Sequence, residues 1–158
     1  MKPTSHYLLC HGFNIHYTAW GDASLPVVIA WHGLARTGRD FDALAEQLAP
    51  HYRVICPDTI GRGLSQWSKA PHNDYSFATY ARITLDLMNA LQIERAHWIG
   101  TSMGGALGTV CAAGLEVPAL QGRIRSLILN DMAPEISTAA VERIKAYAGQ
   151  PPAFDTVP

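Results

Sequence analysis

The feature that most constrains this chain is the pentapeptide Gly-Thr-Ser-Met-Gly at residues 100–104, because it joins an apolar, strand-like run to a run of small residues that favour a helix. A strand that turns into a helix within one residue strains the backbone there and leaves no room for side chains two positions away on either side. Gly100 and Gly104 meet this requirement. The pattern therefore predicts that Ser102 stands on a tight strand-to-helix turn, where a nucleophile can be presented.

The pentapeptide alone also fits a glycine-rich turn with an ordinary serine, and a second segment favours the nucleophile. Residues 26–31 read as another buried strand, and they run directly into His32-Gly33-Leu34 before a helix. That helix carries an apolar face of Phe41, Leu44, Ala45 and Leu48, and a later helix is expected to open at Tyr75 and Ser76. Acyl transfer by a serine needs N–H donors aimed at the oxygen that becomes negative. We expect the backbone N–H groups of Leu34 and Met103 to be those donors, with Gly33 opening the loop and His32 shaping it rather than acting as a base.

The order of these segments resembles the N-terminal half of the α/β-hydrolase-fold family, from about His6 to Asp131. The stretch Asp-x-x-Gly-x-Gly-x-Ser at residues 58–65, after an apolar strand, is similar to the loop found there in the family. It lacks the context of a dinucleotide-binding loop, so we interpret Asp58 as structural. Epoxide hydrolases and haloalkane dehalogenases of this fold have an aspartate at the turn. Ser102 therefore implies the branch of esterases and carbon–carbon-bond hydrolases.

The expected fold is α/β, with a mostly parallel sheet, helices on both faces and the serine turn after the fifth strand, as an incomplete α/β-hydrolase core. Residues 5–9 and 13–19 predict an opening antiparallel hairpin. Alternating strands and helices with right-handed crossovers bring the carboxyl ends of the parallel strands to one edge. We expect the following residues to gather at that edge: Leu34, Asp58, Ser102 and Asp131.

We expect two parts: residues 1–132 as the N-terminal part of the core and residues 133–158 as the start of a truncated cap or lid. Ile136 and Val141 predict a hydrophobic staple around an N-cap Ser137, opening a helix that runs through Tyr147 and stops at Gly149.

The resemblance implies a triad in the chain order serine, acid, histidine. All seven histidines precede Ser102, so we expect this piece by itself to be inactive, with the base in a missing C-terminal half. Asp131, after the strand that follows the serine helix, is a candidate acid, although a residue at this place in the family is more often structural or lines the pocket. Trp31, Trp67 and the residues around Tyr147 are candidates for pocket walls, with simple packing as the alternative.

Three functions remain open on the sequence. The first is a serine hydrolase that acts on an ester or related carbonyl substrate. The second is a non-catalytic truncated half-domain, or an interaction protein that pairs with a second chain through its open sheet edge. The third is an acyltransferase or perhydrolase of the same fold, which would share the serine turn.

Composition supports a small enzyme domain and argues against other classes. With 158 residues, 48% hydrophobic, and a net charge of −1, the chain can bury one core and carries no basic patch for nucleic acid. It has no apolar run of roughly 18 residues and no signal-peptide pattern. Cys10, Cys56 and Cys111 lie in apolar runs and are expected to be free thiols, which favours the cytoplasm. His11 and His16 read as solvated hairpin residues, and we expect no metal or cofactor.

Overall fold

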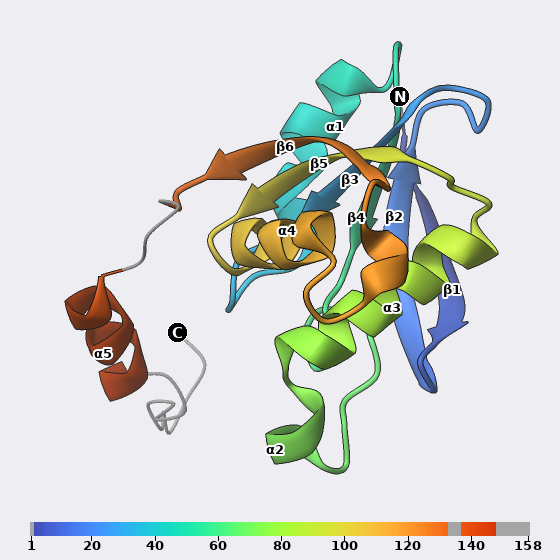
Figure 1. The fold of residues 1–158 in the computed structure, drawn as a ribbon. Coiled ribbons are helices and arrows are strands. Elements are labelled where there is room, and N and C mark those ends of the chain that lie inside the picture. Colours follow the sequence, from blue (N-terminus) through green and yellow to red (C-terminus); the bar gives the residue numbers. More distant parts are fainter. Residues whose placement is uncertain (1, 133–136, 148–158) are drawn as a thin grey trace, which may run out of the picture.

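The computed structural model describes residues 2–132 and 137–147, and a six-stranded sheet forms the centre of the fold (Figure 1). The strands lie across the sheet in the order β1-β2-β4-β3-β5-β6. In chain order the elements are β1 (Thr4–Cys10), β2 (Phe13–Trp20), β3 (Val27–Trp31), the 3-10 helix η1 (Gly38–Phe41), α1 (Asp42–Leu48), β4 (Arg53–Pro57), α2 (Pro71–Asp74), α3 (Phe77–Ala90), β5 (Ala96–Thr101), α4 (Met103–Ala113), the 3-10 helix η2 (Pro118–Leu120), β6 (Ile124–Asn130) and α5 (Thr138–Tyr147).

The sheet confirms the opening hairpin and the parallel core. β1 pairs antiparallel with β2, and β2 pairs antiparallel with β4, whereas β4, β3, β5 and β6 are joined by parallel ladders. The hairpin turn consists of His11 and Gly12, which both have a positive φ, at 49° and 81°. Two central residues with positive φ match the right-handed twist of the flanking strands. The parallel ladders place the carboxyl ends of β3, β4, β5 and β6 at one edge.

Alternating side chains along β3 divide the core into two layers. Ile29 and Trp31 face the cluster that α3 and α4 cover, and Val28 and Ala30 face the cluster that α1 covers. Figure 1 shows α1 on one face of the sheet and α3 and α4 on the other. The prediction of helices on both faces is therefore confirmed, and a strand buried on both faces explains why residues 27–31 are apolar without interruption.

Two local expectations about helices have different outcomes. Ser76 caps α3 as expected, since its hydroxyl accepts a hydrogen bond from the Thr79 N–H at 3.3 Å. Leu44, which we expected on the buried face of α1, is instead 39% exposed. Helix α1 is only two turns long and follows a 3-10 turn, so Phe41 and Ala45 are buried against the sheet and Leu48 is only partly buried there. The expected Ile136 staple and the stop at Gly149 lie outside the described residues.

Strand β6 is the outer strand of the described sheet at the end next to β5 and the serine turn. It pairs with β5 along one side and has no partner strand within the described residues on the other. Ile128, in the middle of β6, is 55% exposed. An outer strand with free backbone groups and an exposed apolar side chain can pair with a further strand.

The three cysteines are free and buried, as the sequence predicts. Burial raises the pKa of the Cys10 thiol to about 11 and the pKa of the Cys56 and Cys111 thiols to about 12. Thiols in such surroundings behave as small hydrophobic side chains. Among the described residues, no helix is both long enough and apolar enough to cross a bilayer.

Candidate active site

Ser102 occupies the single residue between β5 and α4, with φ 50° and ψ −113°. This strained backbone is held by three hydrogen bonds. The Ser102 N–H donates to the Asn130 carbonyl at 3.0 Å, and the Ser102 carbonyl accepts from the N–H groups of Gly105 and Ala106. The side chain is half-buried, and its hydroxyl forms no hydrogen bond with another described residue. The backbone conformation expected at residue 102 is confirmed, and the hydroxyl is available for other partners.

The glycines around Ser102 are needed for close packing. A Cβ on Gly104 would overlap the carbonyl of Trp31, and a Cβ on Gly100 would overlap the carbonyl of Gly104. A Cβ on Gly108, one turn further along α4, would overlap the indole of Trp98. These contacts seat α4 directly against β3 and β5. The spacing of glycines in the sequence therefore reports how closely this helix approaches the sheet.

The loop after β3 lies against the serine turn. A Cβ added to Gly33 would be 3.8 Å from the Cβ of Ser102, so the loop lies about one side-chain carbon away from the serine turn. The N–H groups of Leu34 and Met103 have no hydrogen-bond acceptor among the described residues. Met103 is the first residue of α4, where the helix dipole favours negative charge. Both N–H groups remain candidates for binding an oxyanion.

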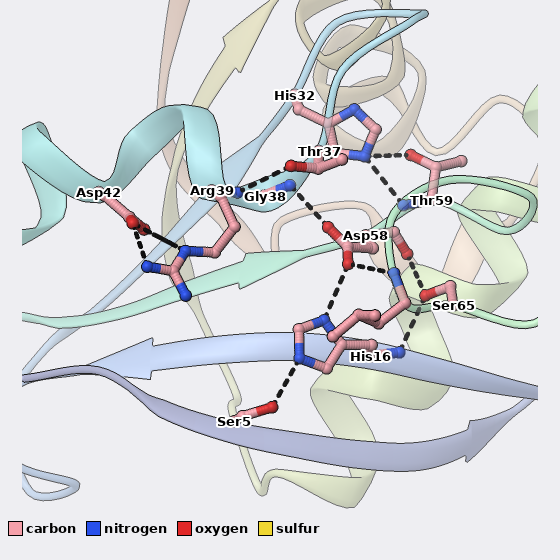
Figure 2. Close-up of polar contacts among 11 residues, drawn as sticks. Ser5, His16, His32, Thr37, Gly38, Arg39, Asp42, Asp58, Thr59 and Ser65 are labelled. Carbon is pink, nitrogen blue, oxygen red and sulfur yellow. Dashed lines mark hydrogen bonds and ion pairs between the residues drawn. The ribbon is translucent and has the colours of Figure 1, made fainter. Parts of the chain in front are cut away.

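His32 is fully buried and holds the loop in place (Figure 2). Its Nδ1 lies 2.7 Å from the Gly33 carbonyl, and its Nε2 accepts the N–H of Thr59 at 2.9 Å. Desolvation by burial lowers the pKa of His32, against the smaller effect of its bond to Gly33. The neutral ring therefore carries its proton on Nδ1. The Gly33 carbonyl and the Leu34 N–H belong to one peptide unit, so His32 orients that N–H.

We expect the pH dependence of stability to change in His32→Gln. Because the folded-state pKa lies below the ordinary 6.5, the neutral ring stabilises the fold fully above pH 6.5, and this contribution is lost as the pH falls below that value. Glutamine keeps an acceptor for the Thr59 N–H but does not titrate. Urea unfolding at pH 8 and pH 5.5 should show a smaller loss of free energy in the variant, after a cost of about 1 kcal/mol at pH 8. Equal losses in both proteins would contradict this role of His32.

Arg62 is a part of this region that the sequence did not reveal. Its Nε donates to the Leu34 carbonyl at 3.1 Å, and its Nη1 donates to the Ile60 carbonyl and the Tyr80 hydroxyl. The guanidinium lies 5.3 Å from the ring centre of Tyr75 and 5.9 Å from that of Tyr80. Cation–π contacts of this kind hold the planar group in position. Arg62 thus holds the Leu34 carbonyl while His32 holds the Gly33 carbonyl, and only the fold brings Tyr75 and Tyr80 to the guanidinium.

The other residues proposed from the sequence lie in different surroundings. Trp31 is fully buried, stacked on Trp98 at 5.5 Å between ring centres, and donates its N–H to Thr59. It is a core residue and not the wall of an open pocket. Trp67 is 71% exposed. Asp131 is exposed at the end of β6, with a φ of 53°, next to the Asn130 carbonyl that Ser102 contacts.

Asp58 has the structural role that we expected, but its partner His16 is not the solvated residue that we predicted. Its Oδ1 accepts the Gly38 N–H at 2.7 Å, and its Oδ2 accepts the Leu64 N–H at 2.9 Å and lies 2.8 Å from Nδ1 of His16. His16 is only 2% exposed, so the expectation of a solvated hairpin histidine was wrong. Ser5, Tyr7 and Asp58 all contact that imidazole, Ser5 and Tyr7 from β1 and Asp58 from the end of β4. The sequence signal was the polar Asp58 at the end of an apolar strand.

Comparison with known proteins agrees with this geometry. The family model described as alpha/beta hydrolase fold matches residues 26–154. The chain is 45% identical over 141 residues to the 3-hydroxybutyrate-oligomer hydrolase of Cupriavidus necator, which covers 89% of this chain and 46% of that protein. It is 28% identical over 144 residues to the (R)-3-hydroxydecanoyl-ACP:CoA transacylase of Pseudomonas aeruginosa, covering 90% of this chain and 46% of that protein. The chain thus spans about half the length of these relatives.

A solved structure extends the similarity to the arrangement of the strands and helices. An alpha/beta hydrolase from Novosphingobium aromaticivorans superposes with a TM-score of 0.83 at 40% sequence identity, covering 94% of this chain and 50% of that one. The strained serine between β5 and α4, the glycines that seat α4 and the match over residues 26–154 all lead to one conclusion. This chain belongs to the alpha/beta hydrolase fold family.

Proposed function

We propose that Ser102 is the nucleophile of a hydrolase that cleaves esters through an acyl-enzyme. The observation that carries this proposal is the geometry at Ser102, a residue with a strained backbone. Among the described residues, its hydroxyl has no hydrogen-bond partner and the N–H groups of Leu34 and Met103 have no acceptor. Ser102 would attack the carbonyl carbon, and the two N–H groups would bind the resulting oxyanion. The positive end of α4 would favour the same charge.

The substrate class that we propose is an ester of a short hydroxy acid, cut at the bond between two units. The 45% identity to a protein named 3-hydroxybutyrate-oligomer hydrolase supports this choice. Such a substrate offers an ester carbonyl of ordinary reactivity, which needs an activated serine. We assign no cofactor to this chemistry, because proton transfer and oxyanion binding suffice for ester hydrolysis.

The base that activates Ser102 is proposed to come from outside residues 1–158. No hydrogen bond joins a histidine to Ser102 within the described residues. His32 is occupied by Gly33 and Thr59, and His97 contacts Ser126 at 2.8 Å. Asp131, at the end of the strand next to Ser102, is our candidate for the acid that would orient such a base.

Complementation tests this proposal. We expect residues 1–158 alone to hydrolyse a 3-hydroxybutyrate dimer at close to the uncatalysed rate, because a serine without a base is a weak nucleophile. Adding the remainder of the Cupriavidus necator hydrolase, as a separate chain or a fusion, should restore turnover, measured as released acid. The fragment added alone is the control. Rapid turnover by residues 1–158 alone would show that the base lies within them.

Acyl transfer is a second candidate, supported by the 28% identity to a protein named as a transacylase. The acyl-enzyme would be the same, and a thiol rather than water would accept the acyl group. Adding a thiol acceptor to the complemented protein separates the two: a transferase forms thioester faster than free acid, and a hydrolase does not.

Pairing through β6 is a third candidate, supported by its single partner strand and by the 55% exposure of Ile128. The occupant would be the C-terminal half of the same fold or a second chain. Ile128→Lys should weaken that pairing, which sedimentation of residues 1–158 with and without the added fragment would measure.

A further inference from the structure

Ser5, His16 and Asp58 form a continuous row of hydrogen bonds that the proposed function does not use (Figure 2). The Ser5 hydroxyl oxygen lies 2.8 Å from Nε2 of His16, and Nδ1 of the same ring lies 2.8 Å from Oδ2 of Asp58. The row therefore joins a hydroxyl, an imidazole and a carboxyl group in the order that serine nucleophiles require.

The strand register explains why these groups meet. Ser5 is opposite Thr18 and Tyr7 is opposite His16 in the β1–β2 ladder, so Ser5 and His16 are diagonal neighbours on one face. Asp58 follows β4, and its N–H donates to the His16 carbonyl at 2.9 Å. The three residues thus come from adjacent strands: Ser5 lies in β1, His16 lies in β2, and Asp58 directly follows the end of β4.

The hydrogen bonds assign a role to each group. The N–H groups of Gly38 and Leu64 can only donate, so both oxygens of Asp58 act as acceptors. Nδ1 of His16 therefore donates to Asp58, and in the neutral ring Nε2 is left to accept the Ser5 hydroxyl proton. His16 and Asp58 are each 2% exposed, whereas Ser5 is exposed on the edge strand. A buried, oriented base beside an accessible hydroxyl is the arrangement that activates a serine.

We propose that Ser5 is a second acyl-accepting site, separate from Ser102, that reacts with activated esters and with phosphonate analogues of them. Ser5 Oγ forms the bond to the carbonyl carbon, Nε2 of His16 takes the hydroxyl proton, and the leaving alkoxide departs with the electrons of the broken C–O bond and receives that proton. With a fluorophosphonate, the P–F bond breaks and fluoride leaves. The proposal includes no oxyanion donors, so it describes slow, stoichiometric acylation.

The chain supplies a matched control for the carboxyl group. Ser126 also lies beside a histidine, with 2.8 Å between its Oγ and Nδ1 of His97. Within the described residues, no carboxyl group bonds the other nitrogen of that ring. If the Asp58 bond activates Ser5, then Ser5 should react faster than Ser126 by about tenfold or more.

The test uses residues 1–158 with Ser102→Ala. Because Ser102 is absent, the result does not depend on whether the proposed role of Ser102 is correct. The protein is incubated with a fluorophosphonate and analysed by intact mass and peptide mapping. We expect one adduct on Ser5, lost when Ser5→Ala is added, retained when Ser126→Ala is added, and absent from urea-unfolded protein. Both added substitutions are at exposed positions, and circular dichroism checks the fold. No adduct, equal labelling of Ser5 and Ser126, or labelling that survives unfolding would overturn the proposal.

Discussion

Ser102→Ala is expected to lower ester turnover of the complemented protein by about 10⁴-fold or more, because loss of a serine nucleophile removes the covalent step. Residual hydrolysis would come from substrate binding and from the N–H groups of Leu34 and Met103. The measurement is the release of acid from a 3-hydroxybutyrate dimer at saturating substrate. Since kcat and kcat/KM depend on the same step, both should fall.

The fold should not be affected by this change. The Ser102 hydroxyl has no hydrogen-bond partner among the described residues, so the free energy of unfolding should change by less than about 0.5 kcal/mol. Ser126→Ala, on the neighbouring strand, is the control for activity and should leave turnover unchanged. Full turnover in Ser102→Ala would mean that another residue is the nucleophile.

Gly104→Ala is expected to destabilise the fold by about 3 kcal/mol or more, and to unfold it if the chain is only marginally stable. Its new methyl group would overlap the backbone carbonyl of Trp31, which belongs to an inner strand and cannot move aside as a flexible side chain would. Helix α4 would have to move away from the sheet. The check is the urea midpoint and the free energy of unfolding, compared with the unchanged protein.

Gly33→Ala is the matched control for steric overlap. The nearest atoms to a Cβ there are the Thr101 carbonyl at 3.7 Å and side-chain carbons of Arg36 and Ser102 at 3.8 Å, which are ordinary contacts. Gly33 does not have a positive φ, so alanine brings no backbone strain. Its stability should stay within about 1 kcal/mol of the original. Equal losses for Gly33→Ala and Gly104→Ala would refute the argument from close packing.

Much of the fold follows from short-range patterns in the sequence. The apolar runs at residues 27–31 and 53–57 became inner strands, and the glycines at residues 100 and 104 marked the serine turn. These features are local: a strand buried on both faces must be apolar, and a helix pressed on a sheet must have small residues at the contact. The strained backbone of Ser102 could be predicted because the turn from strand to helix within one residue, flanked by Gly100 and Gly104, is also a local feature.

The tertiary structure alone decided the surroundings of the polar side chains. His16 read as a solvated hairpin residue until β4 brought Asp58 beside it, and Trp31 was a candidate pocket wall until α4 and Trp98 covered it. Arg62 gained its role only when Tyr75 and Tyr80 came to lie against it. Hydrogen bonds and ring contacts depend on partners far apart in the chain, and a local pattern does not specify which partners arrive. The sequence by itself determined where the backbone turns and which strands are buried, because sterics and hydrophobic burial act on neighbouring residues. The contacts of each polar group were determined by the packing of the whole sheet.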